Sequence, residues 1–228
     1  MYLIEILASF LAAMLVITLH EFAHAYVAYK CGDPTAKFAG RMTLNPIKHF
    51  DPVGMVLFAL TGFGWANPVP INPNNFNDYK KGSLFTSAAG ITLNYLSAFL
   101  FYPLLIVVSV YLIPLVKGTY LAYFLSYFFV GLFTFSLSFC VFNLLPFYPL
   151  DGFRIIEATA KRKGKAYWFL RQYGYYILLG LVAINFLANR ISFLSYFNIL
   201  GYVLNFAINI FGKPITALWN WIFGMIGL

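Results

Sequence analysis

The chain has few charged residues, and acidic ones are especially rare. Only 10% of its 228 residues are charged, with 7 Asp or Glu against 15 Lys or Arg, and 61% are hydrophobic. Ordinary soluble domains carry about 25% charged residues. The composition therefore excludes such a domain and indicates a polytopic membrane protein. The two cysteines, Cys31 and Cys140, lie far apart in the sequence and offer no disulfide framework.

Apolar stretches long enough to cross a bilayer recur along the chain. Since a span needs about 20 apolar residues, we expect an all-α polytopic fold with about five to six transmembrane helices. The predicted spans cover residues 4–30, 84–116, 120–146, 172–189 and 193–211, and residues 214–228 form a further, shorter apolar piece. Residues 52–64 are also apolar but short, which favours a re-entrant segment over a span.

The basic residues indicate the orientation in the membrane. If the N-terminus is extracytoplasmic, most Lys and Arg residues fall in loops on the cytosolic side, at 31–48, 80–81 and 154–171. Only Lys117 and Arg190 then fall in the opposite loops, and Lys213 can be assigned to neither side. This distribution satisfies the positive-inside rule and predicts a multi-pass cell-membrane protein. It also argues against nucleic acid as a partner, because no basic face is left to dock it.

One polar motif interrupts the first span. His20-Glu21-Phe22-Ala23-His24 lies among otherwise apolar residues, in a chain with only 3 His. On a helix this spacing places both imidazoles one turn apart on one face, as two ligands of a single zinc ion require. Glu21 beside them can act as general base. Because ionisable residues inside a membrane usually mark function, the motif predicts a catalytic zinc centre within the bilayer.

A second break in the apolar pattern runs from residue 143 to residue 152, where two prolines and a glycine interrupt the end of a span. Asp151 lies in this break. A lone aspartate in a turn is most often a cap, but a catalytic zinc generally keeps three protein ligands. Asp151 is therefore the leading candidate for the third ligand. His49 and Asp51 are a weaker alternative, for which a structural role or a role at the entrance of the site is favoured.

The proline- and asparagine-rich stretch 65–75 cannot continue a helix, and we expect a small membrane-associated, β-like segment there. Prolines confine a strand to an edge, where its backbone can pair with an incoming extended peptide. A plain connecting loop is an equally weighted alternative. The candidate substrate-binding residues are Asn67, Pro68, Val69, Pro70, Ile71 and Asn72.

These motifs together resemble the site-2 protease family, zinc metalloproteases that cut inside membranes. The resemblance covers roughly residues 10–155 and includes the stretches 20–24, 40–46, 49–54, 64–70, 89–94 and 143–152. It fits the compact bacterial or archaeal branch that lacks a PDZ domain, since the chain has no soluble insertion long enough to be one. The chain departs from the family pattern at Asn67, Ile91 and Tyr148, none of which is a proposed ligand.

The resemblance assigns a role to each site residue. It implies that His20, His24 and Asp151 hold one Zn2+ per chain and that Glu21 is the base. It also implies that Asn94 stabilises the oxyanion, whereas from the sequence alone an intramembrane asparagine is more simply an interhelical hydrogen-bond partner.

The expected activity is zinc-dependent hydrolysis of peptide bonds in or near transmembrane helices of membrane-protein substrates. The expected partners are those substrates and the lipid bilayer, with the active site open toward the cytosol. We expect a single domain over residues 1–228, with a catalytic core at about 4–155 and C-terminal helices at about 172–228. A transporter and an inactive scaffold that binds transmembrane segments are the alternatives. The lack of an internal repeat and the intact Glu21 argue against them.

Overall fold

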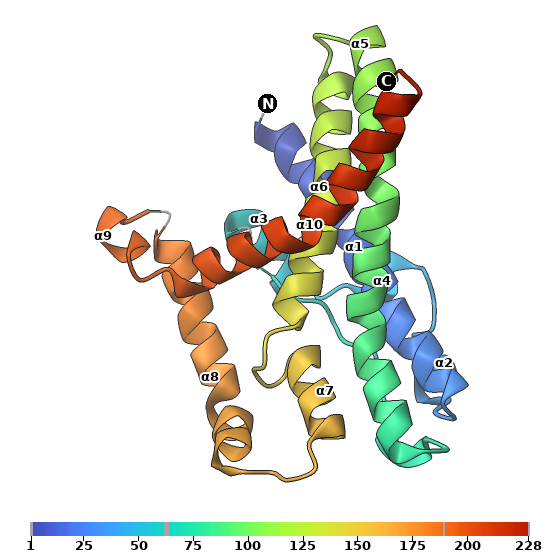
Figure 1. Cartoon of the computed structure of the whole chain (residues 1–228), viewed down its shortest axis with the longest axis vertical. Helices are drawn as coiled ribbons and strands as arrows, with labels where there is room; N and C mark the ends of the chain where they lie inside the picture. The colour runs from blue at the N-terminus through green and yellow to red at the C-terminus, as the bar shows by residue number, and fades with distance from the viewer. Residues whose placement is uncertain (1, 62–63, 189, 228) are drawn as a thin grey trace.

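The computed structural model describes residues 2–61, 64–188 and 190–227, and over these residues it contains helices and no strand (Figure 1). The predicted all-α class is thereby confirmed. The long helices are α1 (Tyr2–Lys30), α4 (Tyr79–Val107), α6 (Tyr120–Asn143), α8 (Lys165–Ala188) and α10 (Ile199–Met225). The short ones are α2 (Thr35–Phe38), α3 (Pro52–Thr61), α5 (Ile113–Leu115), α7 (Asp151–Thr159) and α9 (Ser192–Ser195), with single 3-10 turns at Pro46–His49 and Pro73–Asn75.

Among the described residues, four helical segments are long and apolar enough to cross a membrane, so the chain is a multi-pass membrane protein. They are α1, α6, α10 and the segment Tyr79–Leu115, in which α4 continues through a π-helical turn at Val108–Leu112 into α5. The predicted span at 172–189 corresponds to the second part of α8, which does not meet these criteria over its described residues. Residue 189 lies outside the described residues.

One predicted boundary is wrong. The sequence predicts a span that ends at residue 211 and a separate apolar piece at 214–228. In the structure, α10 is a single helix that runs from Ile199 to Met225 with Pro214 inside it. Proline removes one backbone donor and usually ends a helix. In membrane helices, neighbouring groups can satisfy the freed carbonyl, so the helix continues. Helix α10 thereby packs on both α4 and α6.

Helices α1, α4 and α6 pack against one another and form the centre of the fold. Small residues allow this close packing. Ala8, Ala12 and Ala13 of α1 have no exposed surface, and a Cβ on Gly131 of α6 would lie 3.0 Å from the Cβ of Ala12. Lipid tails are as apolar as leucine, so helices in a bilayer associate mainly through such close backbone approach. The first half of α1 is thus held closely against α6.

The break between α6 and α7 folds back toward this centre. The chain leaves α6 at Asn143, turns through the prolines, and enters α7 at Asp151. Gly152 is required for this turn, because a Cβ there would lie 2.3 Å from the carbonyl oxygen of Leu144. Helix α7 packs on α4, and its first residue reaches α1.

The stretch from Gly64 to Asn72 forms neither helix nor strand in the described part of the chain. The expected β-like segment is therefore an irregular one that makes no strand ladder with described residues. Helix α3 occupies most of the apolar segment predicted at 52–64, and residues 62–63 of that segment lie outside the described residues.

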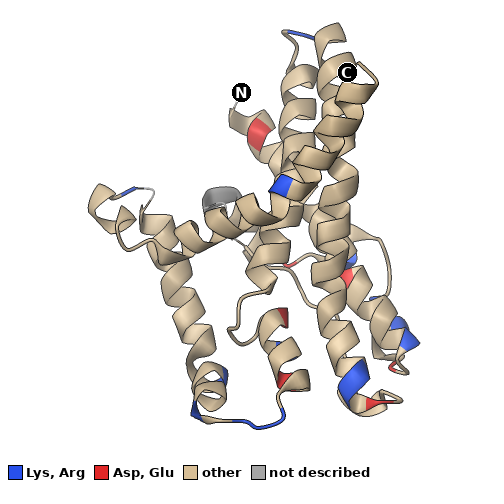
Figure 2. Ribbon diagram, viewed as in Figure 1, with Lys and Arg blue, Asp and Glu red and all other residues tan. Residues whose placement is uncertain are grey.

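Lys and Arg residues gather at one end of the molecule, around α2, the start of α4 and the connection between α7 and α8 (Figure 2). The positive-inside rule predicts that this end faces the cytosol.

Candidate metal centre

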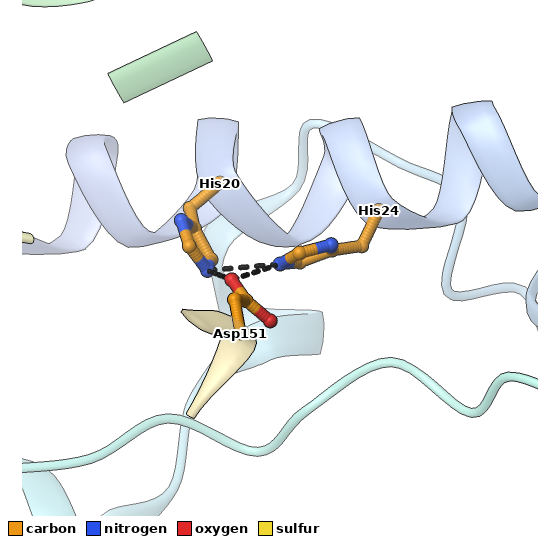
Figure 3. A group of neighbouring side chains, drawn as sticks. All are labelled: His20, His24 and Asp151. Carbon is orange, nitrogen blue, oxygen red and sulfur yellow. Dashed lines mark hydrogen bonds and ion pairs between the residues drawn. The ribbon is translucent and has the colours of Figure 1, made fainter. Parts of the chain in front are cut away.

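Two helices bring together the three predicted metal ligands (Figure 3). His20 and His24 lie one turn apart on α1, and Asp151 begins α7. Asp151 Oδ2 lies 3.3 Å from His20 Nε2 and 3.0 Å from His24 Nε2, and the two Nε2 atoms are 3.0 Å apart. All three residues are buried. In the described part of the chain, no other group of three His, Cys, Asp or Glu side chains converges in this way.

The spacing of these atoms fits a metal ion. Ligand atoms about 2.0–2.1 Å from a tetrahedral zinc lie about 3.3 Å from one another, close to the observed separations. Asp151 Oδ2 is fully buried and has no hydrogen-bond partner among the described residues. A buried carboxylate oxygen without a partner is costly. The donor set of two imidazoles and one carboxylate is one that catalytic zinc uses.

The environment keeps the Asp151 carboxyl ionised. Its burial raises the pKa, but His24 and His20, in the protonated form that they can take when no metal is bound, lower it more, so that the net pKa lies below its ordinary value. The carboxylate is therefore in the state that a metal ligand needs at neutral pH.

Both histidines also contact α4 through their second ring nitrogen. His24 Nδ1 lies 2.7 Å from the carbonyl oxygen of Thr86, and His20 Nδ1 lies 3.0 Å from Nδ2 of Asn94. Asn94 has no exposed surface. The family resemblance implies that Asn94 is an oxyanion donor, but here its amide contacts the His20 nitrogen that is turned away from Asp151 (Figure 3).

Glu21 is buried beside the ligands and is held by the irregular segment. The backbone N–H of Val69 donates to Glu21 Oε2 at 2.8 Å. This contact brings the predicted substrate-binding segment directly against the predicted base. Of that segment, Val69 is buried, Pro70 and Ile71 are half-buried, and Asn67, Pro68 and Asn72 are exposed.

Two residues that the sequence did not single out hold this segment at its ends. Arg41 donates to the carbonyl oxygens of Asn67 and Pro68 at 2.6 and 3.3 Å. The buried Asp33 carboxylate accepts from the backbone N–H of Asn72 at 2.7 Å. It also accepts from both the backbone and the hydroxyl of Thr35 and from the side chain of Asn75. No local sequence pattern links Asp33 to residue 72.

His49 and Asp51 lie outside the cluster and have structural partners. His49 Nε2 lies 2.9 Å from the carbonyl oxygen of Thr43, and the backbone N–H of Asn67 donates to the carbonyl of His49. Asp51 accepts from the backbone N–H of Gly54 at 2.8 Å, at the start of α3. These contacts agree with the structural role favoured for both.

A cavity of about 290 Å3 reaches His24 from the surface. Its lining includes Thr86, which contacts the histidine, and also Tyr148, Arg154, Glu157 and Lys163. Since a water molecule occupies about 30 Å3 of liquid, the cavity holds several. The basic residues that line the cavity lie at the end of the molecule where Lys and Arg residues gather (Figure 2).

The fold and site define an all-α, multi-pass membrane protein with a buried His-His-Asp centre next to a glutamate. The model of Peptidase family M50 matches residues 8–184, and the chain belongs to this family. No solved structure matches the chain significantly.

Two curated relatives match part of the chain. It is similar to "Putative zinc metalloprotease YwhC" of Bacillus subtilis (strain 168), with 46% identity over 140 residues, which are 61% of this chain and 63% of that protein. It is also similar to "Putative zinc metalloprotease Rip2" of Mycolicibacterium smegmatis, with 27% identity over 148 residues, which are 61% of this chain and 52% of that protein. The match thus spans less than two thirds of each relative's length.

Proposed function

We propose that the protein is a zinc-dependent endopeptidase that hydrolyses peptide bonds in or near transmembrane helices of membrane proteins. The observation that carries this proposal is the convergence of His20, His24 and Asp151 with Glu21 beside them. The membership in Peptidase family M50 and the zinc in both relatives' names support it. A zinc ion at these ligands would supply Lewis-acid polarisation of the scissile carbonyl and a water of lowered pKa.

Glu21 acts as the general base. Its carboxylate takes the proton from the attacking water and returns it to the leaving amine. The hydrogen bond from the Val69 N–H occupies Oε2, which leaves Oε1 available for the water. The basic-lined cavity at His24 supplies that water from the end of the molecule that the positive-inside rule places in the cytosol. The N-terminus is then extracytoplasmic.

The irregular segment binds the substrate backbone. Pro68 and Pro70 lack a backbone N–H. The backbone donors of this stretch are therefore those of every second residue, at positions 67, 69 and 71. Among described residues, the N–H and carbonyl of Ile71 and the carbonyl of Val69 make no hydrogen bond. An extended substrate paired with these groups would lie next to Glu21, and the pairing would replace part of the hydrogen bonding lost when a substrate helix unwinds.

The substrate-pairing step has its own test. Ile71→Pro removes the free N–H, whereas Ile71→Ala shortens the side chain and keeps it. Ile71→Pro should raise KM well above that of Ile71→Ala, with metal content unchanged. Equal KM values for the two variants would reject pairing at this position.

The activity itself is tested with purified protein in proteoliposomes and a single-span substrate. Wild type should bind one zinc per chain and cleave the substrate, and Glu21→Gln should bind zinc without cleaving. The matched control is Glu5→Gln, which neutralises an exposed glutamate on the same helix and should cleave as wild type does. Full cleavage by Glu21→Gln would remove Glu21 as the base. Ion flux without proteolysis would favour a transporter, and neither activity would favour a scaffold.

A further inference from the structure

Helix α4 presents a regular stripe of three residues to the histidine pair. Thr86, Gly90 and Asn94 follow one another at intervals of four, so they lie on one face of the helix. A Cβ on Gly90 would lie 2.5 Å from both His20 Cε1 and His24 Nε2. The absence of a side chain at Gly90 therefore lets both imidazoles lie directly on α4, between Thr86 on one side and Asn94 on the other.

The contact with Thr86 determines the tautomer of His24. A backbone carbonyl only accepts, so the Nδ1 that lies 2.7 Å from it carries the proton. His24 Nε2 is then free of a proton and directs its lone pair toward Asp151 and His20. One of the two imidazoles is thus oriented for metal binding by α4.

The contact with Asn94 fixes the corresponding tautomer of His20 only if the amide oxygen of Asn94 faces the imidazole ring. A metal on His20 Nε2 requires the proton on Nδ1, which then needs an acceptor. The amide group of Asn94 lies 3.0 Å from Nδ1, and its oxygen has no hydrogen-bond partner where it stands. The two ends of an amide have nearly the same shape, so their assignment follows from the hydrogen-bond network. If the Asn94 amide is turned so that its two ends exchange places, its Oδ1 accepts a hydrogen bond from the Nδ1–H of His20.

We propose that Asn94 is a positioning residue whose side-chain oxygen accepts from His20 Nδ1–H and so fixes the tautomer and ring orientation with which His20 binds the metal. This proposal rests on the proposed function, because it concerns the metal-loaded site. It differs from the oxyanion role, in which the Asn94 amide would donate to the substrate. The two roles predict different behaviour of a variant that keeps an acceptor at this position.

The first experiment measures zinc affinity by competition with a chromophoric chelator in detergent, for wild type, Asn94→Leu and Asn94→Asp. Loss of a group that orients a ligating histidine typically costs about 10–100-fold in metal affinity. We expect Asn94→Leu to bind zinc about 10–100-fold more weakly than wild type. The zinc affinity of Asn94→Asp should stay within a few-fold of the wild-type value. The control is Ser136→Ala, which removes a buried hydroxyl from α6 and should bind zinc as wild type does.

Two outcomes would overturn the proposal: wild-type affinity in Asn94→Leu, or equal losses in Asn94→Leu and Asn94→Asp. Wild-type affinity in Asn94→Leu together with a loss of kcat would support the oxyanion role. A wild type that binds no zinc would instead reject the proposed function itself.

A second measurement needs no variant at position 94. The chain has only 3 His, so the 15N spectrum of histidine-labelled protein is simple to assign with single His→Gln variants. In the zinc-loaded wild type, we expect the proton of His20 on Nδ1. Zinc-loaded protein with no proton at His20 Nδ1 would overturn the proposal.

Discussion

The backbone N–H of Val69 donates a hydrogen bond to the Oε2 of Glu21 at 2.8 Å. The two residues are 48 positions apart in the sequence, and the bond joins the irregular segment to the proposed base. It gives the segment a second role besides the proposed substrate pairing, since it fixes the direction in which the carboxylate points.

We therefore expect Val69→Pro to lower kcat. The substitution removes the donor, and a hydrogen bond to a charged group is worth about 1.5–3 kcal/mol, which corresponds to about a tenfold or larger loss of rate. Val69→Ala keeps the N–H and is the matched control. Steady-state cleavage of a single-span substrate, with metal content measured on the same samples, gives the comparison. If Val69→Pro has the same kcat as Val69→Ala, the bond does not contribute to catalysis.

Asp151→Asn should weaken zinc binding by about 100-fold or more, since loss of a ligand exceeds the 10–100-fold effect of losing an outer-shell group. The substitution keeps the size of the side chain and removes its charge. Zinc content at limiting metal is the measurement. Asp51→Asn, which alters a carboxylate outside the cluster, should retain zinc. Undiminished zinc in Asp151→Asn would place the third ligand elsewhere.

Gly90→Ala should disrupt the metal centre although it adds only one methyl group. That methyl would lie within 2.6 Å of atoms of both histidines, and overpacking of this kind typically costs about 1–3 kcal/mol. Loss of zinc binding should accompany a lower melting temperature. Gly180→Ala on α8, where a Cβ has no neighbour within 4 Å, should leave zinc binding intact and stabilise the helix by about 0.5–1 kcal/mol. Equal zinc affinity in both variants would contradict the close packing of α4 on the histidines.

The stability that Asp33 contributes should depend on pH. Burial raises the pKa of this carboxyl, but the hydrogen bonds from Thr35, Asn75 and Asn72 lower it more, so the net pKa is below its ordinary value. A lowered pKa in the folded state means that the contribution is complete above the ordinary value of about 3.9 and is lost as pH falls through the folded-state pKa.

Thermal unfolding of wild type and Asp33→Asn measures this contribution. The melting temperature of wild type should exceed that of Asp33→Asn at pH 7, and the difference should shrink as the pH falls below about 4. Asp78→Asn, at the exposed start of α4, is the control and should show a smaller difference at pH 7. A constant difference between pH 7 and pH 3 would show that the ionised carboxylate is not what stabilises this region.

The sequence predicted the His20, Glu21 and His24 arrangement because it depends on helical spacing alone, and the class of fold because it depends on apolar content. The structure also brings Asp151 to the two histidines, an arrangement the sequence could only propose from the number of ligands that zinc keeps. The division of α10 was wrong because the effect of Pro214 depends on neighbouring helices. The anchoring of the irregular segment by Asp33 and Arg41 could not be read from the chain, since those bonds join residues 26 to 42 positions apart.

The stripe of Thr86, Gly90 and Asn94 would restrict how a protease of the proposed kind admits its substrate. Each imidazole depends on α4 for the partner of its second nitrogen, so separating α1 from α4 would deprive both ligands of their orientation at once. Any lateral opening through which a helix arrives from the lipid must leave these two helices together. The moving parts are then to be sought among the other elements, and a cross-link between α1 and α4 should be compatible with turnover.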